Sequence, residues 1–260
     1  MSFKPFFRSF APLAATALGM AIAGCSNAGG YGMSSSSGVP LSELDMSGDA
    51  PTRLSLAGSD RVILQRGERL AIEVEGDPDV RELLRFDRRG DKLEISRERS
   101  MTSTKGRATI RVTMASPVSI AVAGSGAVET DELASEAELS IAGSGSVAAR
   151  NLRAEQLGVS IAGSGEVMAD GTARSLKLNI AGSGDARLDR LEVDDADINI
   201  MGSGNGSFSS DGTVKASIAG SGDVRVYGRA RCTVSAAGSG TLTCAERTSA
   251  AKKAEPDENS

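Results

Sequence analysis

The tripeptide Gly-Ser-Gly recurs seven times between residues 124 and 240, at steps of 18 to 20 residues. A fixed period of this length is typical of repeat proteins, in which each unit buries its apolar face only against its neighbours. A motif present in seven copies is also a poor candidate for a unique catalytic centre. The glycines of the seven copies are Gly124, Gly126, Gly143, Gly145, Gly163, Gly165, Gly182, Gly184, Gly202, Gly204, Gly220, Gly222, Gly238 and Gly240.

Each repeat unit has the pattern of two short strands joined by the glycines. An apolar-polar-apolar triplet precedes the corner, as in Leu139-Ser140-Ile141 and Val159-Ser160-Ile161, and this pattern predicts a strand with one buried face. Two glycines around a serine suit a corner where the backbone needs a positive φ or a close approach to the next unit. Apolar residues follow two and four places later, as in Ala186 and Leu188.

A unit of this length without a helical pattern predicts one coil of a parallel β-helix, with strands of successive coils about 4.8 Å apart. A meander of hairpins is the alternative. Equal spacing and identical corners favour the coil, because stacking places the same residue at the same position in every turn. We therefore expect an all-β solenoid of 18–20-residue coils with Gly-Ser-Gly corners.

Composition excludes several kinds of site. The chain has no histidine and no tryptophan, which rules out His-based acid–base catalysis, Ser-His-Asp triads and histidine metal ligands. Few aromatic residues lie outside the first ten residues, which argues against sites built on aromatic stacking. Without residues 1–24 the chain carries 27 basic and 34 acidic residues, a net charge of −7 that argues against a nucleic-acid partner. We expect no cofactor and no metal.

The N-terminus has the pattern of an export signal. Lys4 and Arg8 precede an apolar stretch over 10–23, which is shorter than the roughly 20 apolar residues needed to cross a bilayer. It ends in Ile22-Ala23-Gly24-Cys25, which resembles the bacterial lipobox. This predicts a signal peptide over 1–24 and a diacylated Cys25; an ordinary cleavage site beside a chance cysteine is the alternative. By the same resemblance, Ser26 after the cysteine favours the outer membrane.

The remaining segments differ in composition. Residues 25–45 are rich in Gly and Ser and predict a flexible tether, and residues 246–260 are charged and predict a disordered tail. The β-helical body then spans 46–245. Cys232 and Cys244 fall at inward positions of the last coils, and export favours a disulfide that braces the open end. Two buried thiols remain the alternative.

Residues 52–117 also read as strands, and Leu54-Ser55-Leu56-Ala57-Gly58-Ser59 has the pattern of a degenerate corner. With Val62–Gly67, Leu70–Asp77 and Lys92–Ser96 in this order before the Gly-Ser-Gly array, residues 52–245 resemble the "putative auto-transporter adhesin, head GIN domain" family. The resemblance implies an exported, right-handed β-helical domain. It supplies no active site.

The best-supported function from sequence is a non-enzymatic adhesive or structural lipoprotein of the envelope, which binds a surface protein, a glycan or a second copy of itself. A β-helical polysaccharide-acting enzyme is one alternative, because Glu166, Asp185 and Asp223 each follow a corner and would align on one edge as acid and base. Ala127, Ser146, Asn205 and Thr241 fill the same slot, which favours solvated polar positions instead.

Calcium binding is the other alternative. Gly-Ser-Gly-Asp at 182–185 and 220–223 is similar to the calcium-binding nonapeptide Gly-Gly-x-Gly-x-Asp. The aspartate comes one place too early and the period is about twice too long, so the carboxylates are not expected to converge on one ion.

Overall fold

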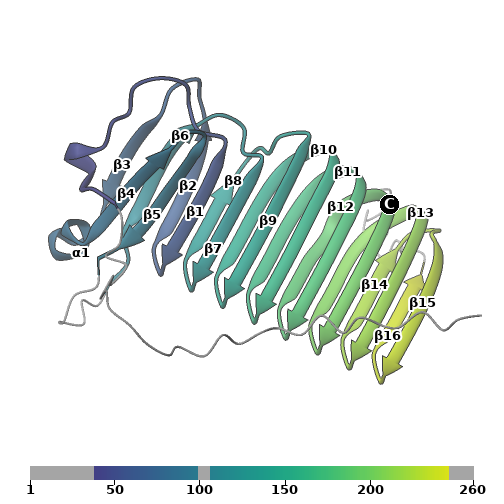
Figure 1. Cartoon of the computed structure of the whole chain (residues 1–260). Helices are drawn as coiled ribbons and strands as arrows, with labels where there is room; N and C mark the ends of the chain where they lie inside the picture. Colours follow the sequence, from purple (N-terminus) through teal and green to yellow (C-terminus); the bar gives the residue numbers. More distant parts are fainter. Residues whose placement is uncertain (1–37, 99–105, 246–260) are drawn as a thin grey trace, which may run out of the picture. The chain divides into compact units, whose positions relative to one another are not determined.

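The computed structural model describes residues 38–98 and 106–245, and within them the array after Pro117 is a stack of parallel coils (Figure 1). Every pairing between its strands is parallel, so the hairpin meander is wrong for this region. The coil strands are β7 (Ser119–Gly124), β8 (Ala127–Thr130), β9 (Glu136–Gly143), β10 (Ser146–Gly163), β11 (Glu166–Gly182), β12 (Asp185–Gly202), β13 (Asn205–Gly220), β14 (Asp223–Tyr227), β15 (Arg231–Gly238) and β16 (Thr241–Ala245).

The register of the stack is set by the corners. Gly163 pairs with Gly182, and Gly182 with Gly202, so each repeat lies directly over the one before it. Side chains alternate between the core and the surface along β10 and β11. The triplet residues Val159 and Ile161 are buried, as the sequence pattern predicted. The core is therefore a column of aliphatic side chains held in register by repetition.

Residues 53–66 form the first coil of the stack. The coil that pairs with it, β7 and β8, comes much later in the chain. β1 (Arg53–Gly58) pairs in parallel with β7, and β2 (Arg61–Arg66) with β8. Gly58 lies opposite Gly124, and its carbonyl accepts a hydrogen bond from the Ser125 amide at 3.0 Å. The degenerate corner expected near Gly58 is confirmed.

The segment between β2 and β7 covers the first coil. β4 (Leu84–Arg89) and β5 (Lys92–Arg97) form an antiparallel pair against β1, and β3 (Ala71–Glu75) pairs antiparallel with β6 (Thr109–Met114) beside β2. The helix α1 (Pro78–Glu82) joins β3 to β4, and its Asp77 side chain caps the Asp79 amide. We call residues 50–117 the N-terminal cap.

The tether expected over 25–45 is ordered at its C-terminal end. Val39 forms an antiparallel bridge with Phe86 of β4, and a short 3-10 helix, η1 (Leu41–Glu43), follows it. Leu41 and Leu44 pack against the core. One backbone bridge and two apolar side chains hold this stretch, so residues 38–45 depart from the predicted tether. The signal peptide, the rest of the tether and the predicted tail at 246–260 lie outside the described residues.

Candidate functional site

The Gly-Ser-Gly corners are places of close backbone approach. Gly182 has a φ of +124°, and a Cβ there would lie 2.4 Å from the Gly163 carbonyl oxygen. At Gly184 a Cβ would lie 2.5 Å from Ile161 Cγ2, so the second glycine is required by packing rather than by φ. The Ser183 amide donates to the Gly163 carbonyl at 2.8 Å. These amides are used between coils, which leaves the corner without a backbone cradle for a ligand.

The residue after each corner lies in one column along the coil stack. Glu166 is opposite Asp185, Asp185 is opposite Asn205, and Asp223 is opposite Thr241. The alignment of the three acids therefore matches the sequence interpretation. We call this set the post-corner column; its members are Ala127, Ser146, Glu166, Asp185, Asn205, Asp223 and Thr241.

Each acid of the post-corner column already has a partner. Asn205 Nδ2 donates to Asp185 Oδ1 at 2.9 Å, and Thr241 Oγ1 donates to Asp223 Oδ1 at 2.6 Å. Glu166 Oε1 lies 2.8 Å from Arg187 Nη1. These contacts join one coil to the next, as a polar ladder would. Nothing here supports the acid–base pair of the enzyme alternative. Within 38–98 and 106–245, no group of three or more metal-ligating side chains forms a cation site.

A shallow groove runs beside this column, on the strand segments that follow the corners. One part, about 390 Å³, is lined by residues that include Arg187, Asn205, Ser207, Arg225 and Tyr227. A second part, about 270 Å³, shares two residues with the first and continues across β11 to β10, where it reaches Met168 and Arg150. We call the two parts together the post-corner groove. Charged and small side chains line this groove. The groove could not be predicted from the equal spacing of the repeats.

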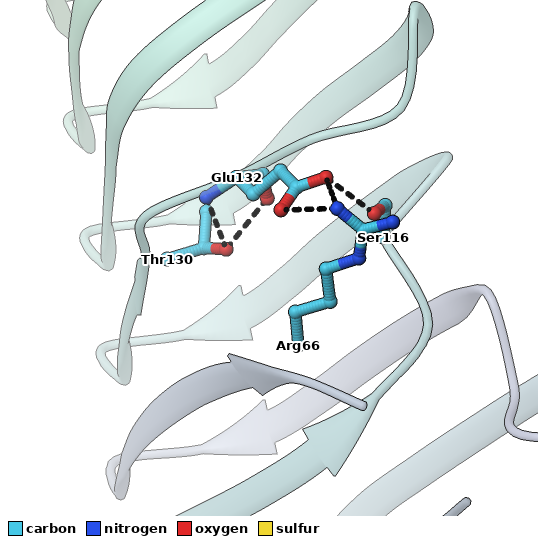
Figure 2. Close-up of polar contacts among 4 residues, drawn as sticks. All are labelled: Arg66, Ser116, Thr130 and Glu132. Atoms are coloured by element: carbon cyan, nitrogen blue, oxygen red, sulfur yellow. Dashed lines mark hydrogen bonds and ion pairs between the residues drawn. The ribbon is translucent and has the colours of Figure 1, made fainter. Parts of the chain in front are cut away.

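A second polar cluster lies where the cap meets the coils (Figure 2). Arg66 Nη1 contacts Glu132 Oε1 at 3.0 Å, and Ser116 Oγ donates to the same oxygen at 2.8 Å. Thr130 Oγ1 donates to the Glu132 carbonyl at 2.7 Å. These contacts tie the end of β2 and the turn after β6 to the turn after β8. The four residues contact one another, which supports a structural role for the cluster between the cap and the coils.

The cap holds a buried ion pair that no sequence pattern indicates. Asp60 is 1% exposed, and it accepts hydrogen bonds from Arg97 Nε at 2.7 Å and from the Ala108 amide at 2.7 Å. Arg97 also donates to the Gly106 carbonyl at 3.0 Å. The hydrogen bond to Asp60 raises the pKa of Arg97 above its usual value. The carboxylate thus links three cap segments that are distant in sequence.

The C-terminal end of the stack carries the disulfide. Cys232 of β15 and Cys244 of β16 are bonded, with their Cα atoms 6.7 Å apart. Cys232 is partly buried against the core and Cys244 is exposed, so only the first matches the inward position expected. The bond joins the two strands of the last described coil.

Cys25 lies outside the described residues, and its acylation stays a prediction. No helix among the described residues is long and apolar enough to span a bilayer.

The family model described as "putative auto-transporter adhesin, head GIN domain" matches residues 50–230. The chain belongs to this family. The match takes in the N-terminal cap and most of the coils, including the whole post-corner groove. A search among curated proteins found no match.

Several solved structures share the fold. A putative adhesin from Bacteroides fragilis aligns with a TM-score of 0.63 at 18% identity, covering 76% of this chain and 92% of that one. A putative lipid binding protein from Parabacteroides distasonis aligns at 0.60 with 22% identity, over 76% and 93%. A putative adhesin from Parabacteroides merdae aligns at 0.56 with 19% identity, over 76% and 92%. Identities this low establish the fold alone.

The head GIN family and these neighbours are described as adhesins or as lipid binding, and none is described as an enzyme. This agrees with carboxylates that are engaged between coils. The post-corner groove is one surface that is open to a ligand, and a cavity of about 660 Å³ lined by Leu44, Phe86 and Arg88 lies beside β4.

Proposed function

We propose that this head GIN protein is a non-enzymatic binding module of the bacterial envelope, anchored through a lipid on Cys25 and acting in adhesion. The family's adhesin description supports an address at the envelope or cell surface. The lipobox-like Ile22–Cys25 supports the anchor, and Ser26 supports the outer membrane.

The post-corner groove is the observation that carries the binding role. It is open and extended over the strand segments from β10 to β14, and its lining is rich in hydrogen-bonding side chains. Enzymes need reactive groups held free for a substrate, whereas here Asp185 and Asp223 are hydrogen-bonded within the stack and Glu166 forms an ion pair with Arg187. A rigid polar surface of this kind suits recognition of another surface, either a protein or a glycan. Self-association is a further mode of the same function.

Lipid binding is described for one structural neighbour. The post-corner groove suits an acyl chain poorly, because arginines and aspartates line it and hydrocarbon gains nothing from such groups. Most apolar residues of the coils are instead packed inside the stack, with Met168, Met201 and Val234 as exposed exceptions.

The anchor is tested by metabolic labelling with a radioactive fatty acid in bacteria that express the full chain. The wild type is expected to incorporate label and to fractionate with the outer membrane. Cys25→Ala is expected to lose the label. Label that persists in Cys25→Ala would contradict the anchor.

The binding role is tested with the full chain in detergent micelles against arrays of cell-wall glycans, polysaccharides and extracellular matrix proteins. Saturable binding to at least one target is expected. The control is the urea-unfolded chain diluted directly onto the array, since a folded surface is required. An absence of saturable binding to every target would contradict the adhesive role.

A further inference from the structure

We propose that the post-corner groove binds a linear glycan that carries oxyanions, laid along the coil axis so that Arg150 and Arg225 contact it at opposite ends. This names a ligand class and a site for the proposed binding function, on which it rests. The inference depends on which hydrogen-bonding groups of the groove are used within the protein and which are left over.

Asp170 has contacts at both carboxylate oxygens, and Asp185 and Asp223 each accept a hydrogen bond at one. Asp170 accepts from the Asn151 amide at 2.8 Å and lies 3.5 Å from Arg190 Nη2. Asp185 accepts from Asn205, and Asp223 accepts from Thr241. A ligand that offers donors would have to compete with these contacts. Such a competition yields little net free energy, since one hydrogen bond replaces another.

Two of the four arginines that line the groove are left over, because Arg187 and Arg190 are paired with acids. Arg150 and Arg225 are exposed, and no described residue forms a hydrogen bond or ion pair with either guanidinium. A guanidinium presents five N–H donors in a planar fork that matches the two oxygens of a carboxylate or the oxygens of a sulfate or phosphate. These two guanidiniums therefore call for acceptor oxygens with negative charge.

The spacing of the two arginines calls for an extended ligand. Arg150 ends the first segment of β10, and Arg225 lies on β14, which is four strands along the sheet. At about 4.8 Å per strand the two are separated by about 19 Å along the stack. The intervening side chains that face the same way include Met168, Arg187 and Ser207. A single small anion cannot span this length, whereas a linear oligosaccharide can.

The acidic net charge of the chain is expected to lower the affinity for an anionic glycan. It does not change which groups contact the glycan. Long-range attraction of a polyanion is not expected at −5 for the full chain. The contacts must act at short range, where each guanidinium makes a charge-assisted hydrogen bond. We therefore expect modest affinity that falls as ionic strength rises.

The test is calorimetric titration of the full chain in detergent with oligogalacturonates of defined length, at 50 mM salt. Binding is expected for oligomers long enough to span the two arginines, and to be at least tenfold weaker for the dimer. Neutral oligomers of matched length are expected not to bind. Arg150→Ala and Arg225→Ala are each expected to weaken binding about tenfold, in line with the loss of a charge-assisted contact. The same oligomers carrying sulfate in place of carboxylate distinguish the two oxyanion sources.

Arg153→Ala is the matched control. Arg153 is also exposed, and it lies on β10 just beyond the bulge that contains Arg150, outside the groove. Its substitution is expected to leave the affinity unchanged. An equal loss in Arg153→Ala would show that only general charge matters and would overturn the site. Equal binding of the dimer would overturn the extended mode.

Two further outcomes separate this inference from the proposed function. If the chain binds a matrix protein on the array but no charged oligosaccharide, the glycan inference fails and the adhesive role stands. If vesicles of phosphatidylglycerol bind through Arg150 and Arg225 while the oligosaccharides do not, a membrane is the ligand and the glycan inference is wrong. If nothing binds, both fail.

Discussion

The coils over 119–245 and the N-terminal cap over 50–117 build the same sheet by different means. In the coils, one short pattern repeats, and each corner is fixed by the carbonyl of the corner before it. In the cap, antiparallel pairs close the first coil, and single contacts such as the Asp60–Arg97 pair join segments that nothing repeats. Repetition makes the coils tolerant at any one surface position, whereas the cap depends on a few irreplaceable groups.

The cap is therefore expected to be the more fragile region, and Asp60→Ala tests this. Removal of the carboxylate leaves Arg97 and the Ala108 amide without their partner inside the protein. Loss of one member of a buried ion pair costs about 3–5 kcal/mol. We expect the free energy of unfolding in urea to fall by this amount, with the cap losing its hydrogen-exchange protection first.

Asp91→Ala is the control for that variant. Asp91 pairs with Arg53 at 3.0 Å, and the two side chains are 61% and 57% exposed. An exposed pair contributes less than about 1 kcal/mol. Equal destabilisation by the two variants would contradict the special role of Asp60.

A corner glycine tests the coils in the same assay. Gly182→Ala places a Cβ 2.4 Å from the Gly163 carbonyl oxygen at a φ of +124°. Both the clash and the backbone strain oppose it, and we expect a loss of about 3 kcal/mol. Gly158→Ala is the matched control, because its Cβ would meet nothing closer than Glu138 Cγ at 3.6 Å. That variant is expected to be neutral or slightly stabilising. Similar losses at both glycines would contradict a role for close approach.

The open end of the stack should be weaker than the coils behind it, and the disulfide offsets this. Cys232 and Cys244 are separated by 12 residues, and a loop of that length predicts a contribution of about 2–3 kcal/mol. We expect the double variant Cys232→Ser, Cys244→Ser to lose this amount, with faster hydrogen exchange in β15 and β16. A reducing agent should destabilise the wild type and leave the double variant unchanged. Unchanged exchange in β15 and β16 would show that the bond braces nothing.

The same contrast explains what the sequence could predict. The coil register follows from equal spacing, so the corners, the buried residues such as Ile161 and the alignment of the post-corner column were all readable. The hydrogen-bond partners of the column residues could not be predicted. Each partner is a residue of a neighbouring coil, and the residue type differs from coil to coil. Arg225 was missed for this reason, since Met168 and Ser207 occupy its position in earlier coils. Arg150 has no equivalent on β11, because it lies in the register shift between Ala149 and Leu152.

The cap offers no period from which such contacts could be read. Asp60, Arg97 and Ala108 come together only once the antiparallel pairs have formed. The anchoring of Val39 on Phe86 was hidden in a segment rich in Gly and Ser. In both cases a single long-range contact decides the local structure, and composition alone points the other way.

The smallest effect is expected at an exposed corner of the coils. Asp211 accepts the Arg229 amide at 2.8 Å, and that backbone hydrogen bond, followed by the one from the Arg229 side chain, lowers the pKa of Asp211 below its ordinary 3.8. Since the folded pKa is the lower one, its contribution to stability is present above pH 3.8 and is lost as pH falls through the folded value. Carboxyl carbon NMR should show this lowered pKa.

Arg229→Ala separates the two donors, because it removes the guanidinium and keeps the amide. The pKa of Asp211 is expected to rise only part of the way toward 3.8 in this variant. A full return would assign the shift to the side chain. In that case Asp211 would depend on one side-chain contact, as the cap does. It would not depend on the backbone hydrogen bonds between coils that repeat along the stack.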